Sequence, residues 1–458
     1  MQNFPAPARR LSRRAGADGQ RKGGFPVAVI SAGPLRRPFP RPAPTSNRQF
    51  AILLAAEGIS MLGSRITFVA LPWLVLTSTD SALLAGVAGF AEMLPYVLSG
   101  LIGGPIVDRV GPRPTAVAAD TASVLAVAGI PIFAFYQDTS LTVLILLIAL
   151  AGALRGFGDA AKRALLPRTI AAAGVSTERG TTLYDGVARA STLIGLPLAG
   201  LLIAALGPST VLLFDAATFG VAALLIGALV RVGAADAAAC DEQKEQGYAA
   251  ALRNGFRYVR ADRLILGVMS LLFVTNMFDQ AYATVFIPVW VRDGPHGPAA
   301  LGVVGTAFGL GAVAGNILYT VFATRLPRRL TFGICFFLGG PAQLLALALT
   351  DRVWVVLATA AISGALMSTV NPILLAAVYR RIPVHMHGRV ISVLISVSWA
   401  GIPLGGVLGG WATDVLGLRT AALLAAIGYL AVTAAPFVFP AWQALDRTDP
   451  VPKAVAPA

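Results

Sequence analysis

The chain has 458 residues, of which 56% are hydrophobic and only 13% are charged, and its formal net charge is +14. A soluble globular domain carries about 25% charged residues, so this composition excludes a water-soluble surface around most of the chain and indicates a lipid environment. The two cysteines and three histidines match no metal-binding spacing. We therefore expect no metal, no cofactor and no disulfide framework.

Residues 1–48 hold no apolar run long enough to cross a membrane and are rich in proline and arginine. Asp18 is the only acidic residue among them. Such a composition is typical of a disordered segment, and we expect a basic cytoplasmic arm. A wrongly assigned start codon is the alternative.

Twelve segments from residue 49 onward are apolar and near the length of about 20 residues that a membrane-spanning helix needs. They lie at 49–76, 81–107, 114–136, 141–162, 182–206, 208–230, 263–291, 299–323, 330–350, 353–378, 390–413 and 418–440. The boundary between the fifth and sixth segments depends on Gly207-Pro208. The sequence predicts an all-α membrane protein with about twelve transmembrane helices and a cytoplasmic tail at 441–458.

The basic residues are distributed unequally between the two sides of the membrane. With the amino terminus inside, most of the 36 Lys and Arg residues fall in inner segments. The outer loops hold Arg292, Arg352 and Arg419, and the spans hold Arg65, Arg155 and Arg189. The positive-inside rule then predicts a multi-pass protein of the cell (inner) membrane with both termini in the cytoplasm. The same distribution accounts for the basic charge, so no nucleic-acid partner is expected.

A polar linker at 231–262 divides the spans into six and six. Its second part predicts an amphipathic helix, with apolar residues on one face and arginines on the other. The apolar face holds Tyr248, Leu252, Phe256 and Val259, and the basic face holds Arg253, Arg257 and Arg260. This helix lies on the inner leaflet or packs on protein, and the sequence does not distinguish the two.

Short glycine-containing sequences recur in the two halves in the same order. Gly152-Ala153-Leu154 recurs as Gly364-Ala365-Leu366, and the Gly195, Pro197 and Gly200 pattern of the fifth span recurs as Gly401, Pro403 and Gly405-Gly406 in the eleventh. Glycine permits close helix approach and proline permits a bend. The repeat favours two pseudo-symmetric six-helix bundles at 49–230 and 263–440.

The loop after the second span carries the most specific motif in the chain. Its residues are Gly104, Asp108, Arg109, Gly111 and Arg113. In this spacing they resemble the loop signature of the major facilitator superfamily, which implies the fold of two six-helix bundles around a central cavity.

The resemblance also implies a gating role for this loop. Gly104 would permit close helix approach, and Asp108 would accept hydrogen bonds at the start of the eleventh helix, near Gly388-Arg389. Pro112 replaces the family's usual first basic residue, which leaves Arg113 to form the charge network. In the alternative interpretation, the loop is a turn whose arginines only fix the orientation of the chain.

Two further resemblances concern the direction of transport. The Gly195, Pro197 and Gly200 pattern resembles a superfamily motif associated with antiporters and exporters. The segments 371–390 and 255–260 resemble the branch that includes enterobactin exporters and macrolide efflux proteins, and the likeness covers about residues 49–440.

Charged residues inside the spans are candidates for the coupling machinery, because a charge there needs a partner or a water-filled cavity. Glu92 lies nearest the midplane and Glu57 nearer the inner side, so both are candidates for carrying the coupled proton. Arg65 is a candidate partner of Glu92. Arg155, where the superfamily often has an intramembrane arginine, has Asp159 one helical turn away as a candidate partner. Alternatively, these acids only fix helix packing.

These observations together predict a secondary transporter and not an enzyme, since no catalytic constellation and no ATP-binding loop stands out. We expect export of a small amphipathic compound, such as a drug, an antibiotic or a siderophore-like metabolite. The mechanism would be proton antiport with alternating access in a monomer surrounded by the lipid bilayer. An uptake permease for a nutrient or metabolite, with the same fold, is the alternative.

Overall fold

The computed structural model describes residues 47–135, 141–230, 248–323, 325–383 and 386–446, and the side chains of a few helical residues are also left undescribed. The chain divides into residues 1–43 and residues 44–458, and everything below concerns the second unit. Nearly all of the predicted arm, the first part of the linker and most of the predicted tail lie outside the described residues.

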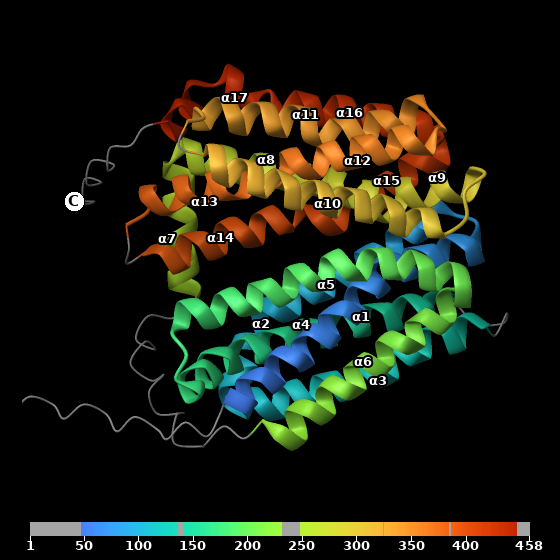
Figure 1. The fold of residues 1–458 in the computed structure, drawn as a ribbon, viewed down its shortest axis with the longest axis vertical. Helices are drawn as coiled ribbons and strands as arrows, with labels where there is room; N and C mark the ends of the chain where they lie inside the picture. Colours follow the sequence, from blue (N-terminus) through green and yellow to red (C-terminus); the bar gives the residue numbers. More distant parts are fainter. Residues whose placement is uncertain (1–46, 136–140, 231–247, 324, 384–385, 447–458) are drawn as a thin grey trace, which may run out of the picture. The chain divides into compact units, whose positions relative to one another are not determined.

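Six helices form the amino-terminal half (Figure 1). They are α1 (Asn47–Thr79), α2 (Ala82–Val110), α3 (Pro112–Phe135), α4 (Leu141–Ala173), α5 (Thr177–Leu206) and α6 (Pro208–Leu229). The predicted boundary between the fifth and sixth spans is confirmed. Gly207 separates the two helices with a positive φ of 78°, a conformation that glycine adopts without strain.

The carboxy-terminal half follows α7 (Tyr248–Ala261) and contains six further spans, four of which are interrupted helices. The spans are α8 (Arg263–Ala281) with a π-helical turn at Tyr282–Phe286 and α9 (Ile287–Asp293), α10 (Ala299–Phe322), α11 (Arg328–Leu349), α12 (Val353–Met367) with α13 (Val370–Arg381), α14 (His387–Trp399) with α15 (Gly401–Leu416), and α16 (Leu418–Thr433) with α17 (Ala435–Val438). Twelve helices of the described chain are long and apolar enough to cross a membrane, which confirms the predicted all-α membrane fold.

One span boundary was predicted wrongly. The fourth span was expected to end at Lys162, but α4 continues to Ala173. Lys162 therefore lies inside the helix, where it is buried, and not in a loop. The prediction failed because loss of apolar character marks the end of lipid contact, whereas the helix itself continues where its neighbours cover it.

The recurring glycines make equivalent contacts in the two halves. A Cβ atom at Gly152 of α4 would overlap the carbonyl oxygen of Glu92 in α2. A Cβ atom at Gly364 of α12 would overlap the carbonyl oxygen of Phe308 in α10. In each half, the second and fourth spans meet at an equivalent glycine. The internal repeat is therefore present in the structure as well as in the sequence.

The two halves touch near the end of the bundle that carries α9, here called the α9 end. There α5 meets α10 at Gly200 and Gly302, and α15 meets α2 at Gly406 and Gly86, again in equivalent positions. Toward the opposite end, which carries α7 and is called the α7 end, the two groups of helices diverge (Figure 1). In the described chain, the glycine contacts between the halves therefore lie at the α9 end.

Candidate functional site

An ion pair joins α2 and α4 in the middle of the amino-terminal half. The guanidinium Nη1 of Arg155 lies 2.6 Å from Glu92 Oε1, and the two side chains are 12% and 5% exposed. The same guanidinium lies over the ring of Tyr96, 4.7 Å from its centre. The Tyr96 hydroxyl in turn donates a hydrogen bond of 3.0 Å to Asp159. One connected group therefore holds two acids, one arginine and one tyrosine.

This arrangement corrects both predicted pairings. Arg155 pairs with Glu92 and not with Asp159, and Glu92 does not pair with Arg65. The reason is the close approach of α2 and α4, since a Cβ atom at Gly156 would overlap the Ser99 hydroxyl of α2. At such a contact the neighbouring helix offers a nearer partner than the next turn of the same helix.

Some charged side chains within the spans are exposed along α1 and α5. Arg65 of α1 is exposed, with its Cβ against Gly195 of α5, and Asp185 and Arg189 of α5 are exposed as well. A charged group within a span faces protein or water and not lipid. These residues therefore indicate a water-filled space beside α1 and α5.

A pocket of about 180 Å³ lies between the two halves. Tyr96, Asp159 and Arg163 line it from the amino-terminal half, and Ser396 and Trp399 line it from the carboxy-terminal half. Two aromatic rings combined with groups of both charges suit an amphipathic molecule, which needs apolar walls and a few polar contacts. This pocket and the adjoining Glu92–Arg155 pair form the candidate substrate site.

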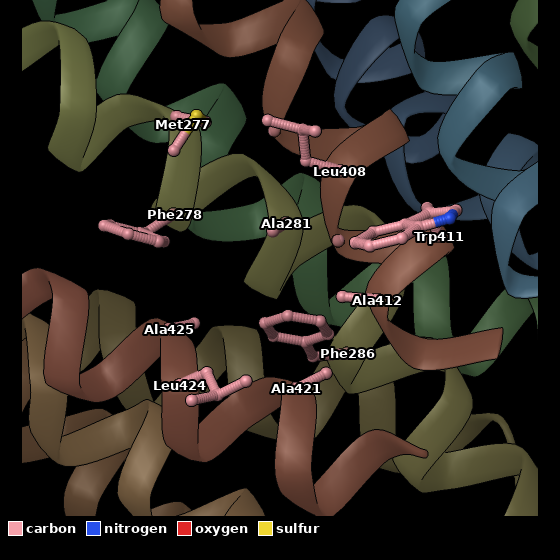
Figure 2. A pocket seen from close by; sticks show the side chains of 12 residues that line it. Met277, Phe278, Ala281, Phe286, Leu408, Trp411, Ala412, Ala421, Leu424 and Ala425 are labelled. Carbon is pink, nitrogen blue, oxygen red and sulfur yellow. The ribbon is translucent and has the colours of Figure 1, made fainter. Parts of the chain in front are cut away.

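A second pocket contains no charged side chain. It measures about 240 Å³ and lies within the carboxy-terminal half, where Phe278, Phe286, Leu408 and Trp411 are among the residues that line it (Figure 2). Its other lining residues are apolar or glycine. Such walls bury apolar groups but offer nothing that would orient a polar compound, so the pocket between the halves is the better candidate site.

A buried cluster of charges surrounds Lys162. The Lys162 ammonium lies 3.1 Å from Asp120 Oδ1 of α3 and 3.7 Å from Glu57 Oε2 of α1, and all three side chains are 1% exposed. Lys162 also donates a hydrogen bond of 3.0 Å to the Ser60 hydroxyl. Glu57 Oε1 accepts a hydrogen bond of 2.7 Å from the Tyr184 hydroxyl of α5. Side chains from four helices therefore form one connected cluster, in which Lys162 is held by α1 and α3 and Glu57 by α5.

Sequence reasoning placed Glu57 among the coupling candidates and Asp120 near the end of its span, but it missed Lys162 and Tyr184. One signal was available in the fourth span. Arg155, Asp159 and Lys162 follow one another at intervals of four and three residues, which places three charges on one face of a single helix. Such a stripe is expensive in lipid and indicates charged partners on neighbouring helices.

Two other acids are buried elsewhere. Asp215 of α6 accepts hydrogen bonds from the hydroxyls of Thr67, at 2.5 Å, and Thr218, at 3.1 Å. Asp279 of α8 lies beside the ring of Tyr429. Neither forms an ion pair within the described part of the chain, so they lack the cation that distinguishes the Lys162 cluster.

The loop signature is exposed at the α7 end. Gly104, Asp108 and Arg109 are exposed, and a Cβ atom at Gly104 would meet nothing within 4 Å. The predicted close approach at Gly104 is therefore wrong for this conformation. The predicted contact between Asp108 and the start of the eleventh span involves Gly388-Arg389, whose side chains lie outside the described residues.

Two other residues of this motif have structural partners. Gly111 ends α2 with a φ of 99° and donates its N–H to the carbonyl of Val107 at 2.8 Å. Arg113 donates to the carbonyls of Ile226 and Gly227. It thus caps the carboxyl end of α6, where a cation is favourable, and does not form the charge network expected of it.

The glycines of the fifth and eleventh spans lie where close approach was predicted. A Cβ atom at Gly195 would come within 2.7 Å of Arg65 Cβ. Cβ atoms at Gly401 and Gly405 would overlap the carbonyl oxygens of Phe273 and Met277 in α8. Each of these three glycines therefore lies where two helices come close together. Pro197 and Pro403 lie inside α5 and α15, and Pro403 is buried.

The linker helix α7 packs on protein through part of its surface. Val259 is fully buried, whereas Phe256 is 43% exposed. The hydroxyl of Tyr258 donates to the Arg381 carbonyl at 2.9 Å, and Asp262 pairs with the Arg381 side chain. Burial and the Asp262 carboxylate raise the pKa of Tyr258, so it stays a neutral donor. The side chains of Tyr248 and Leu252 lie outside the described residues.

Comparisons with known proteins agree with this architecture. The profile of a family described as transmembrane secretion effector matches residues 41–457. The multidrug efflux pump Tap of Mycobacterium tuberculosis is 32% identical over 402 residues, which cover 87% of this chain and 93% of that protein. Macrolide efflux protein A of Streptococcus pyogenes is 20% identical over 81% of this chain and 91% of its own length.

Solved transporter structures share the fold. The nucleoside transporter NupG superposes with a TM-score of 0.67 at 11% identity, covering 86% of this chain and 100% of that chain. A bacterial homologue of the human lysosomal transporter Spinster, in an inward-facing and unoccupied conformation, superposes with a TM-score of 0.61 at 13% identity. It covers 88% of this chain and 98% of its own chain.

Proposed function

The chain belongs to the major facilitator superfamily, in its transmembrane secretion effector family, and from this premise we propose that it exports small amphipathic drugs in exchange for protons. The relatives named as a multidrug efflux pump and a macrolide efflux protein support a drug or antibiotic as cargo. The halves of a single chain form the pocket between them, so the transporter works as a monomer.

The conformation supports alternating access. In the proposed orientation the α7 end is cytoplasmic, because the inner segments carry most of the Lys and Arg residues. Both chain termini then lie in the cytoplasm of a cell whose inner membrane holds the protein. The halves meet through glycine backbones at the α9 end and diverge at the α7 end, which corresponds to a state that loads cargo from the cell interior.

The pocket between the halves is the observation that carries the proposal. Tyr96 and Trp399 supply rings from opposite halves, and Asp159 and Arg163 supply charges of both signs. Because the two walls belong to different halves, movement of the halves would dismantle the pocket and release a bound compound. Proton exchange supplies the energy, since the chain has no ATP-binding loop but does have buried acids.

A susceptibility profile tests the proposal. An efflux-deficient bacterium would express wild type, Trp399→Ala, Asp159→Asn or the control Asp351→Asn, which removes an exposed acid paired with Arg419 far from the pocket. We expect wild type and the control to raise the inhibitory concentration of erythromycin and of other amphipathic compounds. The two pocket variants should lower this resistance or change which compounds it covers.

Other outcomes would change the assignment. Increased sensitivity of cells that produce wild type would indicate uptake and favour the permease with the same fold. Equal resistance in wild type and both pocket variants would show that the cargo does not bind between Tyr96 and Trp399. Immunoblots of the membrane fraction control for the amount of each variant.

A further inference from the structure

The Lys162 cluster holds one base and two acids in a volume that water does not reach. The ammonium of Lys162 contacts Asp120 at 3.1 Å and Glu57 at 3.7 Å, and no side chain of the three is more than 1% exposed. If both acids were ionised, the cluster would carry one negative charge in excess. An uncompensated charge in a protein interior costs several kcal/mol, so one added proton makes the cluster neutral and more stable.

The hydrogen bonds of the cluster are also incomplete. Glu57 Oε2 and Asp120 Oδ2 are buried without a hydrogen-bond partner in the described chain. Buried carboxylate oxygens normally have such partners. A proton on either acid reduces the number of oxygen acceptors that need a hydrogen-bond donor. A structural ion pair in which every oxygen already has a donor gains nothing from an added proton. Both the charge balance and the orphaned oxygens therefore indicate an exchangeable proton.

We propose that Glu57 and Asp120 share one exchangeable proton next to the fixed cation Lys162, and that this cluster is the proton-binding site of the antiport. The proposal rests on the proposed function. In the release step, movement of the surrounding helices admits water to the cluster. The carboxyl O–H bond then breaks, the proton passes to that water as hydronium, and the electron pair stays on the carboxylate. Uptake from the other side of the membrane reverses the step.

The groups around the cluster are compatible with this assignment. They are Ser60 of α1, Ser123 of α3, Asp159 and Arg163 of α4, and Tyr184 of α5. The serines and the tyrosine are neutral hydroxyls, and Asp159 is opposed by Arg163 on the same helix. With Arg163 and Asp159 counted, the described cluster still carries one negative charge in excess when its acids are all ionised.

The fourth span connects this cluster to the candidate substrate site. Lys162 lies seven residues, or two turns, after Arg155, so both project from one face of α4 about 10 Å apart. Asp159 lies between them and holds Tyr96 of the pocket. A change of charge at Lys162 alters how tightly α4 is held to α1 and α3, and the same helix supplies one wall of the pocket. Binding of substrate and binding of a proton therefore both affect helix α4.

A spectroscopic test needs no substrate. Infrared difference spectra of the purified, lipid-reconstituted protein are recorded while pH is raised, and the carbonyl band of a protonated carboxyl group is followed. We expect a band in wild type that disappears with rising pH and is missing from both Glu57→Gln and Asp120→Asn, because each variant leaves Lys162 with one acid. The band should persist in Asp215→Asn, the matched control for a buried acid without a cation.

Two spectroscopic outcomes would overturn the assignment. A band that remains in both cluster variants places the proton elsewhere, and its loss in Asp215→Asn alone would assign it to that residue. A band lost in only one of the two cluster variants would show that this acid holds the proton by itself and that no sharing occurs.

Transport in inverted vesicles separates coupling from a structural role. Wild type should accumulate labelled erythromycin against its gradient when the membrane is energised, and should exchange labelled for unlabelled erythromycin without energy. Glu57→Gln and Asp120→Asn should keep exchange and lose accumulation, because exchange needs the pocket but no net proton flux. Accumulation by both variants, or loss of exchange in both, would contradict the proposal. Failure of wild type to transport refutes only the proposed function, since the infrared test stands independently.

Discussion

The Glu92–Arg155 pair is a one-to-one ion pair at the contact of α2 and α4. Each group satisfies the other at 2.6 Å, and Arg155 is also supported by the Tyr96 ring. This balance distinguishes the pair from the Lys162 cluster, in which two acids compete for one base. The depth of Glu92 in the membrane makes it a coupling candidate, but in our proposal its partner makes it a structural and substrate-positioning group.

Removal of one partner of this pair should destabilise the protein. Glu92→Gln leaves the Arg155 guanidinium without its counter-ion, and breaking a buried pair costs about 3–5 kcal/mol. We expect a lower unfolding temperature in detergent and lower drug resistance in cells. Thermal unfolding followed by tryptophan fluorescence measures the first effect.

A double variant is the control for this prediction. Glu92→Gln with Arg155→Gln removes both charges, so the unfolding temperature should recover toward that of wild type. If the double variant were as unstable as the sum of the two single variants, the pair would contribute no coupling energy, and its 2.6 Å contact would lack the role assigned to it.

At the scale of the helices, glycine backbones form the contact between the halves. Gly200 of α5 lies against Gly302 of α10, and Gly86 of α2 lies against Gly406 of α15. Backbones at this separation leave no room for a side chain, so the α9 end can close only because these positions lack a Cβ atom. The equivalent placement of both contacts follows from the internal repeat.

A larger side chain at this contact should hold the α9 end open. Gly200→Val would overlap the backbone of Gly302, which cannot move as a side-chain tip would. We expect loss of drug resistance with normal amounts of protein in the membrane. Gly186→Ala on the same helix is the matched control, since its Cβ atom would meet nothing within 4 Å, and it should behave as wild type. Full activity of Gly200→Val would show that closure does not require this contact.

At the scale of the whole molecule, two side chains of the carboxy-terminal half hold the turn between α1 and α2. Asp414 accepts hydrogen bonds from the N–H groups of Ala82, at 3.0 Å, and Leu83, at 2.9 Å, and from the Ser81 hydroxyl at 2.9 Å. An acid at a helix amino terminus satisfies unpaired donors and opposes the positive end of the helix dipole. Arg292 pairs with Asp80 of the same turn at 2.8 Å.

Asp414 should stabilise the state that is closed at the α9 end. A cap of this kind contributes about 1 kcal/mol, and a change of that size alters the ratio of two states about fivefold. In Asp414→Ala we therefore expect more of the state that is open at the α9 end. The measurement is the labelling rate of Ala88→Cys, buried on α2, by a membrane-impermeant maleimide in a background with Cys240 and Cys335 replaced by serine.

A second acid substitution provides the comparison for this labelling experiment. Asp351→Asn breaks an exposed ion pair with Arg419 inside the carboxy-terminal half and should leave labelling unchanged. Equal labelling rates in wild type and Asp414→Ala would show that the cap does not contribute to closure. A rise in both variants would point to general loosening of that half.

The sequence by itself determined the features that depend on solvent and on local backbone. It gave the positions of the twelve spans, because apolar runs of this length are stable only in lipid, and the break at Gly207, because only that residue type adopts the required backbone there without strain. It also gave the glycines at which helices meet and the repeat of the two halves.

Only the tertiary structure decided which charges pair. Sequence spacing favoured Asp159 for Arg155, but the partner is Glu92 on another helix, and Lys162 meets Glu57 and Asp120 from two further helices. Likewise, Arg113 donates to a carbonyl at the end of α6 and does not join a charge network in the loop. Such partners are distant in the chain, and they are brought together by the rotation and depth of packed helices. Those quantities depend on every side chain at the contacts, so no local pattern in the sequence specifies them.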